Sequence, residues 1–352
     1  MCHAVAPRCL PGPGRRPVLA THDVATLFGD LVGRPRRVFL AGVSMGGHVI
    51  ARSMEQYPGF YAGALPMCGA LGDRALFDYF LDYQLVAQAL AGVRAYPAPE
   101  DYLTAVVPRI EQALGLNRLT PTGPDVVGER GAELRAIVTN RTGGPRPGAD
   151  AAFAYWKDFL FRLGASPQGS GRGSGPDQVA TNIGTVYQPD APVDVNTTVR
   201  RVPPANPLAR FLPSLTTVPR VLGTPSGPVV SLHGLDDEFV PFSMEQVYAA
   251  AVAGHGRGQL LAQRVIRTVG HCEFDTREVA TAWHDLVRWV DTGERPAADA
   301  VGDPAVIAAP DYGCRFSDPD AYRDPPRGST RRLLPPCPPA TAVSSRAVPG
   351  SG

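Results

Sequence analysis

Residues 37–50, RVFLAGVSMGGHVI, constrain the fold more than any other part of the chain. Residues 38–41 have the length and composition of a buried strand, and residues 48–57 have the pattern of a helix. The GVSMGG turn between them (residues 42–47) matches G-x-S-x-G in the strand–turn–helix context of a nucleophile elbow, which exposes a strained serine above the sheet. We expect the two glycines of the motif, Gly42 and Gly46, to allow this turn, with Gly47 as a further structural residue of the motif. We also expect Gly46 to keep the helix close and the Met45 N–H to point at a forming oxyanion. The alternative interpretation of Ser44 is an ordinary glycine-rich turn.

A histidine and a carboxylate follow two later strands. Residues 228–233 (PVVSLH) form an apolar run that precedes GLDDEFVP, and residues 260–266 form another that precedes TVGHCEF. A carboxylate just past the end of a strand can orient an imidazole. The chain order Ser44, Asp237, His271 is therefore that of a serine, acid and histidine triad.

The motifs GVSMGG, HGLDDEFVP and VGHCEF resemble the nucleophile, acid and histidine loops of the α/β-hydrolase superfamily. Within it, the chain is similar to secreted actinobacterial serine hydrolases with a large inserted cap, from about residue 20 to residue 296. The resemblance implies that Ser44 is the nucleophile and His271 the general base. It implies Asp237 as the acid, because the carboxylate of the family falls four residues after the histidine of its HG motif; Asp236 and Glu238 remain alternatives.

The resemblance also implies the fold: an incomplete α/β-hydrolase fold, a mostly parallel sheet with flanking helices, and a large helical cap insertion. Its parts would be an irregular leader (residues 1–19), a discontinuous core (residues 20–70 and 226–296) and a cap (residues 71–225) with a flexible linker near 166–176. An irregular tail (residues 297–352) would follow, disordered from about residue 325. Only 36 residues precede Arg37, with one predicted helix over 23–32 and no HG-type loop. We therefore expect the N-terminal part of the fold, with the second oxyanion donor, to be missing.

The most aromatic segment is a predicted helix over residues 150–163 of the expected cap. An aromatic stripe at helical spacing is more often part of a core than of a ligand pocket. If the cap covers Ser44, four of its residues are candidates for an apolar or aromatic acyl pocket: Phe153, Tyr155, Trp156 and Phe159. His233, inside the HG motif, is expected to be structural.

Two cysteines lie near the expected catalytic face. Cys68 ends the strand after the elbow helix, and Cys272 follows His271, so a Cys68–Cys272 disulfide in an oxidising compartment is one interpretation. A Cys272–Cys314 bridge and free buried thiols are the alternatives. No signal peptide is recognisable, whereas the resemblance suggests a secreted protein. No Cys or His spacing predicts a metal site, and no cofactor is expected.

The formal net charge of +1 gives no indication of a nucleic-acid partner, and no apolar run approaches the roughly 20 residues that span a bilayer. The sequence thus predicts a serine hydrolase of small carboxylic esters, with an amidase or peptidase of the same fold as the alternative. A catalytically impaired remnant or a non-catalytic binding protein is the alternative from another class. A metal- or phosphate-binding α/β domain is disfavoured, because ligand clusters and a GxxxxGK[ST] loop are absent.

Overall fold

The computed structural model describes residues 16–164, 179–189, 194–212 and 220–338, and its centre is a four-stranded parallel sheet in the order β1-β2-β3-β4. The strands are β1 (Phe39–Val43), β2 (Gly63–Met67), β3 (Val229–Gly234) and β4 (Leu261–Ile266). Each lies where an apolar run predicts it. β3 and β4 are buried along their whole length, as expected for strands covered on both faces.

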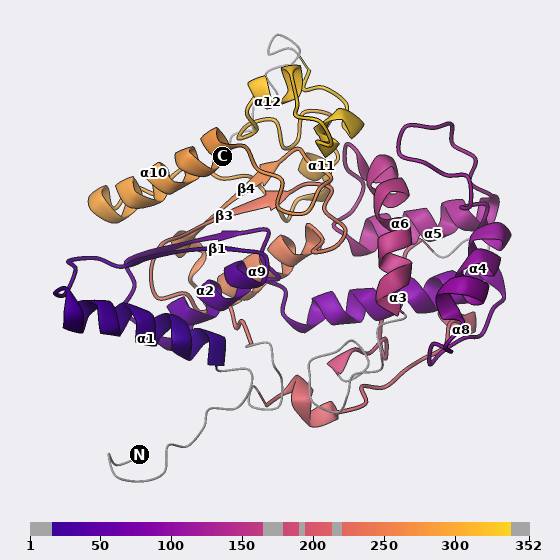
Figure 1. Ribbon diagram of the computed structural model, residues 1–352, viewed down its shortest axis with the longest axis horizontal. Coiled ribbons are helices and arrows are strands. Elements are labelled where there is room, and N and C mark those ends of the chain that lie inside the picture. The colour runs from indigo at the N-terminus through magenta and orange to yellow at the C-terminus, as the bar shows by residue number, and fades with distance from the viewer. Residues whose placement is uncertain (1–15, 165–178, 190–193, 213–219, 339–352) are drawn as a thin grey trace, which may run out of the picture.

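Helices cover both faces of the sheet (Figure 1). On one face Leu65, Val230 and Ala262 pack against α10 (Thr276–Thr292). On the other, the alternate residues of the strands pack against α2 (Met45–Gln56) and α9 (Ser243–Gly254). This alternation is the two-residue period of a strand, and it produces three layers. The predicted class, an α/β fold with a parallel sheet and flanking helices, is confirmed.

Helix α1 (Arg16–Leu31) packs on α2 and begins seven residues before the predicted start at Asp23. Residues 16–19 are therefore helical, which corrects the prediction of an irregular leader over 1–19; residues 1–15 lie outside the described residues. The predicted apolar side of this helix is exposed, from 49% at Phe28 to 76% at Leu31. On this helix Val18 is buried, and the ring of the half-buried His22 stacks on Tyr57, the residue that follows α2.

The residues between β2 and β3 form a second group of helices with its own apolar core, to the right of the sheet in Figure 1. Its longest helices are α3 (Arg74–Ala91), α5 (Glu129–Arg141) and α6 (Ala149–Gly164). Shorter elements are a π-helical turn (Tyr102–Val106), α4 (Val107–Leu114), α8 (Val195–Thr198) and a 3₁₀ turn (Pro207–Arg210). Apolar residues at helical spacing in the sequence predict helices over residues 73–91, 101–114 and 150–163, where α3, the π-helical turn with α4, and α6 lie. The sequence does not predict α5. The expected linker near 166–176 lies outside the described residues.

The C-terminal part of the described chain packs above β3 and β4 (Figure 1). After α10 this part contains only short elements: α11 (Pro304–Ile307), α12 (Asp320–Arg323) and a 3₁₀ turn (Thr330–Leu333). A second 3₁₀ turn (Gly258–Leu260) lies earlier in the chain, directly before β4. Arg331 is buried, and Cys337 is bonded to Cys314. The prediction of disorder from about residue 325 is therefore wrong for residues 325–338. Buried polar contacts hold this segment, and such contacts produce no hydrophobic periodicity in the sequence. Residues 339–352 lie outside the described part.

Candidate active site

The turn between β1 and α2 holds Ser44 in a strained conformation, with φ 55° and ψ −120°. A side chain at Gly42 would place its Cβ 2.5 Å from the carbonyl carbon and oxygen of Gly46, and one at Gly47 would lie 3.1 Å from the Cα of Gly69. Both positions therefore need glycine. A Cβ at Gly46 meets nothing within 4 Å, so the expectation that Gly46 is the residue that keeps the helix close is wrong. The close approach is made by the backbone of Gly46 against Gly42.

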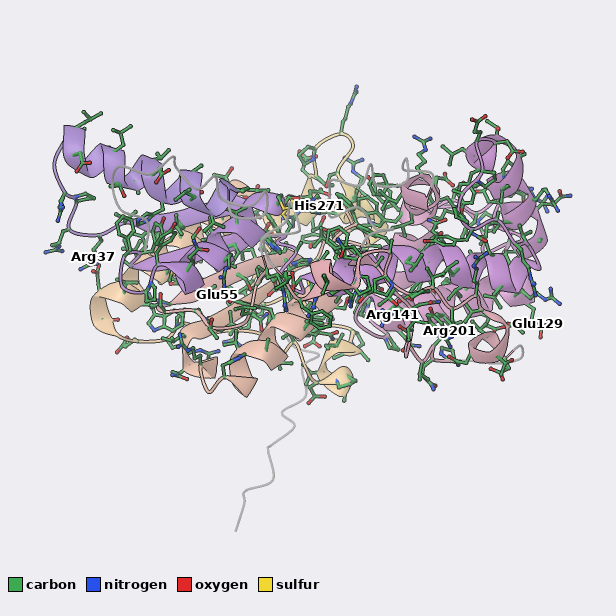
Figure 2. The ribbon with its side chains drawn as sticks, turned by 90° about the horizontal axis from the view of Figure 1, so that it is seen from below. Arg37, Glu55, Glu129, Arg141, Arg201 and His271 are labelled. Atoms are coloured by element: carbon green, nitrogen blue, oxygen red, sulfur yellow. A yellow bond between two sulfur atoms is a disulfide. The ribbon has the colours of Figure 1, made fainter. Side chains whose placement is uncertain are left out.

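Three side chains from distant parts of the chain meet at this turn. His271 Nε2 lies 2.8 Å from Ser44 Oγ, and His271 Nδ1 lies 2.6 Å from Asp237 Oδ2. The other oxygen of the fully buried Asp237 accepts hydrogen bonds from the N–H groups of Phe239 and Val240, at 2.9 and 3.1 Å. A carboxylate held this way accepts the Nδ1–H, which leaves Nε2 to accept the Ser44 hydroxyl. Figure 2 shows His271 near the middle of the molecule, between the sheet and the helical group.

The two alternative carboxylates turn away from His271 toward Arg146. Arg146 Nε lies 2.9 Å from Asp236 Oδ1, but its N–H is directed at the carbonyl of Leu235, also at 2.9 Å. The carboxylate oxygens of Asp236 and Glu238 are buried without a hydrogen-bond partner. Burial, only partly offset by Arg146, raises the pKa of Asp236 to about 7 and that of Glu238 to about 8. The geometry therefore favours Asp237 as the partner of His271.

Met45 is the first residue of α2. The first N–H groups of a helix have no acceptor inside the helix, so the N–H of Met45 is open to a ligand beside Ser44.

His233 is buried below the carboxylate loop. Its Nε2 donates to the carbonyl of Val240 at 2.8 Å, and its Nδ1 lies 3.2 Å from Glu245 Oε1. Burial lowers the pKa of His233, but the hydrogen bond and charge of Glu245 outweigh it, and the pKa is raised overall. His233 thus holds the end of the loop that carries Asp237.

A disulfide lies beside His271. Cys68 directly follows β2 and is bonded to Cys272, and both residues have positive φ, 45° and 59°. Of the interpretations open from the sequence, the structure contains the Cys68–Cys272 bridge; Cys314 pairs with Cys337 instead. Cys68, His271 and Cys272 are the one cluster of candidate metal ligands among the described residues, and the two sulfur atoms there are bonded to each other.

Aromatic rings from the helical group reach His271 through Phe239. The Phe239 ring lies 4.9 Å from the imidazole, and the Phe159 ring lies 4.8 Å from Phe239, both edge-to-face. Trp156 lies 6.3 Å from Phe239 and donates its Nε1–H to the carbonyl of Val269. Phe80 of α3 also stacks on Phe239, at 6.0 Å.

The other two aromatic candidates are placed differently. Phe153 is fully buried in the core of the helical group, and Tyr155 is 42% exposed and contacts Trp156. Phe239 is not among the residues predicted for the site, although it lies two residues after Asp237, inside the HGLDDEFVP motif. Its place in that motif is the sequence signal that could have identified it.

No helix of the described chain combines the length and apolar character needed to cross a membrane.

No protein-family model matches the chain. An o-phthalyl amidase of Xanthobacter agilis is 29% identical over 107 residues, which are 30% of this chain and 24% of the amidase. The chain therefore spans about a quarter of the relative that it matches.

Two solved structures are similar in part. Feruloyl esterase B from Aspergillus oryzae has a TM-score of 0.43 at 15% identity, over 79% of this chain and 64% of the esterase. The rice cell wall degrading esterase LipA from Xanthomonas oryzae has a TM-score of 0.30 at 15% identity, over 81% and 67%. In its parallel sheet, its strained serine turn and the order of its serine, carboxylate and histidine loops, the chain resembles the α/β-hydrolases.

Proposed function

We propose that this chain is a serine hydrolase that cleaves a small carboxylic ester by two-step acyl transfer. The observation that carries the proposal is the continuous hydrogen-bond chain from Ser44 Oγ through His271 to buried Asp237. A serine on a strained turn, a histidine within 2.8 Å and a carboxylate that fixes the tautomer are the parts that nucleophilic catalysis needs.

In the first step Ser44 Oγ attacks the carbonyl carbon while His271 Nε2 takes its proton. The tetrahedral oxyanion forms next to the Met45 N–H. Asp237 stabilises the imidazolium, which then gives the proton to the departing alkoxide, and an alcohol leaves. Water attacks the acyl-enzyme with His271 as base; the acid is released, and Ser44 regains its proton.

The similarity to an amidase favours a second candidate, an amide substrate at the same site. The leaving group is then an amine, which takes the proton from His271 in the same way. The rings of Phe239, Phe159 and Trp156 supply an apolar surface beside the histidine, so the helices between β2 and β3 act in this proposal as a cap over the acyl group. Two disulfides suit an oxidising compartment, as in a secreted protein.

The test compares 4-nitrophenyl butyrate with the 4-nitroanilide of the same acid. An ester hydrolase releases 4-nitrophenol with an initial burst equal to the enzyme concentration if deacylation is slow, and it cleaves the anilide far more slowly. Anilide cleavage at a comparable rate would favour the amidase. If the wild-type protein cleaves neither the ester nor the anilide faster than the Ser44→Ala variant does, the result would support a non-catalytic protein on this fold.

A further inference from the structure

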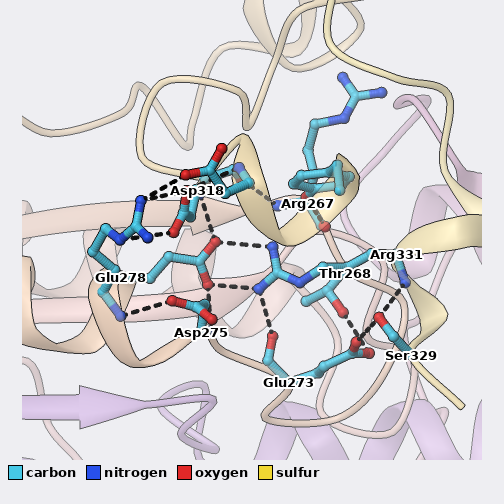
Figure 3. Close-up of polar contacts among 12 residues, drawn as sticks. Arg267, Thr268, Glu273, Asp275, Glu278, Asp318, Ser329 and Arg331 are labelled. Atoms are coloured by element: carbon cyan, nitrogen blue, oxygen red, sulfur yellow. Dashed lines mark hydrogen bonds and ion pairs between the residues drawn. The ribbon is translucent and has the colours of Figure 1, made fainter. Parts of the chain in front are cut away.

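The C-terminal turn 329–331 contacts the loop that carries His271, although some 60 residues separate the two along the chain. Figure 3 shows the polar contacts in this region, among them those of Glu273, Ser329 and Arg331. Thr330 and Arg331 are both buried, at 5% and 4% exposure. Buried polar groups are costly unless they are hydrogen-bonded, and here they are.

The hydroxyl of Thr330 holds the chain on both sides of His271. Its Oγ1 accepts the N–H groups of Val269 and Gly270, at 3.1 and 2.6 Å, immediately before the histidine. The same hydroxyl donates to Glu273 Oε2, at 2.5 Å, two residues after it. One side chain therefore binds both ends of the segment 269–273 in which His271 lies.

Glu273 accepts three further hydrogen bonds, two of them from the turn 329–331. Its carboxylate accepts the Ser329 hydroxyl, the Thr330 N–H and the Thr268 hydroxyl. Burial raises the pKa of Glu273, but these hydrogen bonds outweigh it and the pKa is lowered overall. The carboxylate is thus ionised at neutral pH and accepts all of these bonds.

Arg331 fixes the turn itself. It forms two parallel hydrogen bonds with the buried Glu278, Nη1 to Oε1 at 2.9 Å and Nη2 to Oε2 at 2.6 Å. Its Nη2 also donates to the carbonyl of Glu273, at 3.3 Å. Glu278 accepts from the N–H of Asp275 at the start of α10, so the turn is tied to a rigid helix. Such bidentate pairs have a well-defined geometry.

We propose that Thr330 is a positioning residue for His271, and that the turn 329–331 sets the histidine in line with Ser44 and Asp237. This inference rests on the proposed function. Thr330 does not touch the reacting atoms. It binds the backbone N–H groups of Val269 and Gly270 and the carboxylate of Glu273, and the segment between these contacts carries the imidazole. Because a displacement of about 1 Å at a catalytic group can cost on the order of 10²-fold in rate, the loss of this hydroxyl should reduce kcat and leave substrate binding nearly unchanged.

The test replaces Thr330 by valine, which keeps the shape and removes the hydroxyl, and by serine, which keeps the hydroxyl. We expect kcat for 4-nitrophenyl butyrate to fall about 10- to 100-fold in Thr330→Val with KM within about twofold, and to return to within about threefold of wild type in Thr330→Ser. Thr292→Val is the matched control, since the Thr292 hydroxyl binds backbone groups at the exposed end of α10, the carbonyl of Arg288 and the N–H of Glu294. An unchanged kcat in Thr330→Val, or an equal loss in Thr330→Ser, would overturn the inference.

Two further measurements keep the outcome clear. If Thr330→Val does not fold, Ser329→Ala removes one donor to Glu273 and should lower kcat about threefold; wild-type kcat in that variant would count against the proposal. If the wild-type protein has no turnover, the hydrolase proposal fails, and the downfield proton resonance of His271 Nδ1–H tests positioning separately. That resonance should move or broaden in Thr330→Val but not in Thr292→Val, and identical resonances would refute the positioning role.

Discussion

The buried carboxyl of Glu238 should make the stability of this protein depend on pH, and Glu238→Gln isolates its contribution. Glu238 is fully buried, its two oxygens have no hydrogen-bond partner, and Arg146 Nη2 is 3.9 Å away. Asp236, Asp237 and the phenol rings of Tyr79 and Tyr83 are the other titratable groups that face it. Burial raises its pKa from the ordinary value of 4.5 to about 8.

The direction of the effect follows from which state binds the proton. Below pH 4.5 both states are protonated and the contribution of Glu238 is fully present. As the pH rises toward 8 the unfolded chain ionises while the folded protein keeps the proton, so the free energy of unfolding falls by about 1.4 kcal/mol per pH unit. Between pH 5.5 and 7.5 the loss due to Glu238 is about 2.5 kcal/mol, and it levels off above its folded pKa.

Urea unfolding at pH 5.5, 6.5 and 7.5 measures this contribution. Glu238→Gln removes the ionisable group at nearly constant shape, so its free energy of unfolding should fall less with pH than that of the wild type, by about 2.5 kcal/mol over this interval. Asp236, whose pKa is raised to about 7, should leave a residual slope in the variant. The exposed Glu294→Gln should follow the wild type. Parallel curves for wild type and Glu238→Gln would mean that Arg146 keeps Glu238 ionised in the folded protein.

Three further substitutions test the elbow and the aromatic surface. Gly42→Ala should lower the free energy of unfolding by about 1–3 kcal/mol in chemical denaturation, because its Cβ meets the Gly46 backbone at 2.5 Å. Gly46→Ala should leave the free energy of unfolding unchanged or raise it by up to about 1 kcal/mol. Equal effects of the two substitutions would contradict the packing described for the turn. Phe239→Leu should lower kcat/KM for an aromatic acyl ester about tenfold relative to an acetate ester, measured side by side, since one aromatic contact contributes about 0.5–1.5 kcal/mol. A proportional loss for both esters would show that Phe239 only supports His271.

The sequence predicts the sheet and the serine, acid and histidine loops well, because each depends on a local signal. An apolar run followed by a turn marks every strand, and Ser44, Asp237 and His271 each lie within five residues of the end of one. The Cys68–Cys272 pair is foreseeable for the same reason, since both cysteines follow segments that end at one edge of the sheet.

The remaining features depend on contacts between distant segments. Thr330 lies in a proline- and arginine-rich stretch without hydrophobic periodicity, and its role follows only from where the chain folds back. Phe239 lies inside a recognised motif, but its ring partners come from α3 and α6, which no local pattern places near it. The apolar residues of α1 have helical spacing yet stay exposed, because spacing predicts which residues share one side of a helix and not what covers that side.

We propose that Ser44 is a nucleophile activated by His271. Incubation with a fluorophosphonate probe, followed by mass mapping of the labelled peptide, tests it most directly. We expect one adduct, on Ser44, that forms in the wild-type protein and is lost in Ser44→Ala. Its rate of formation should fall by about 10³-fold or more in His271→Ala. Equal labelling of the wild-type protein and Ser44→Ala, or an adduct on another residue, would contradict the assignment.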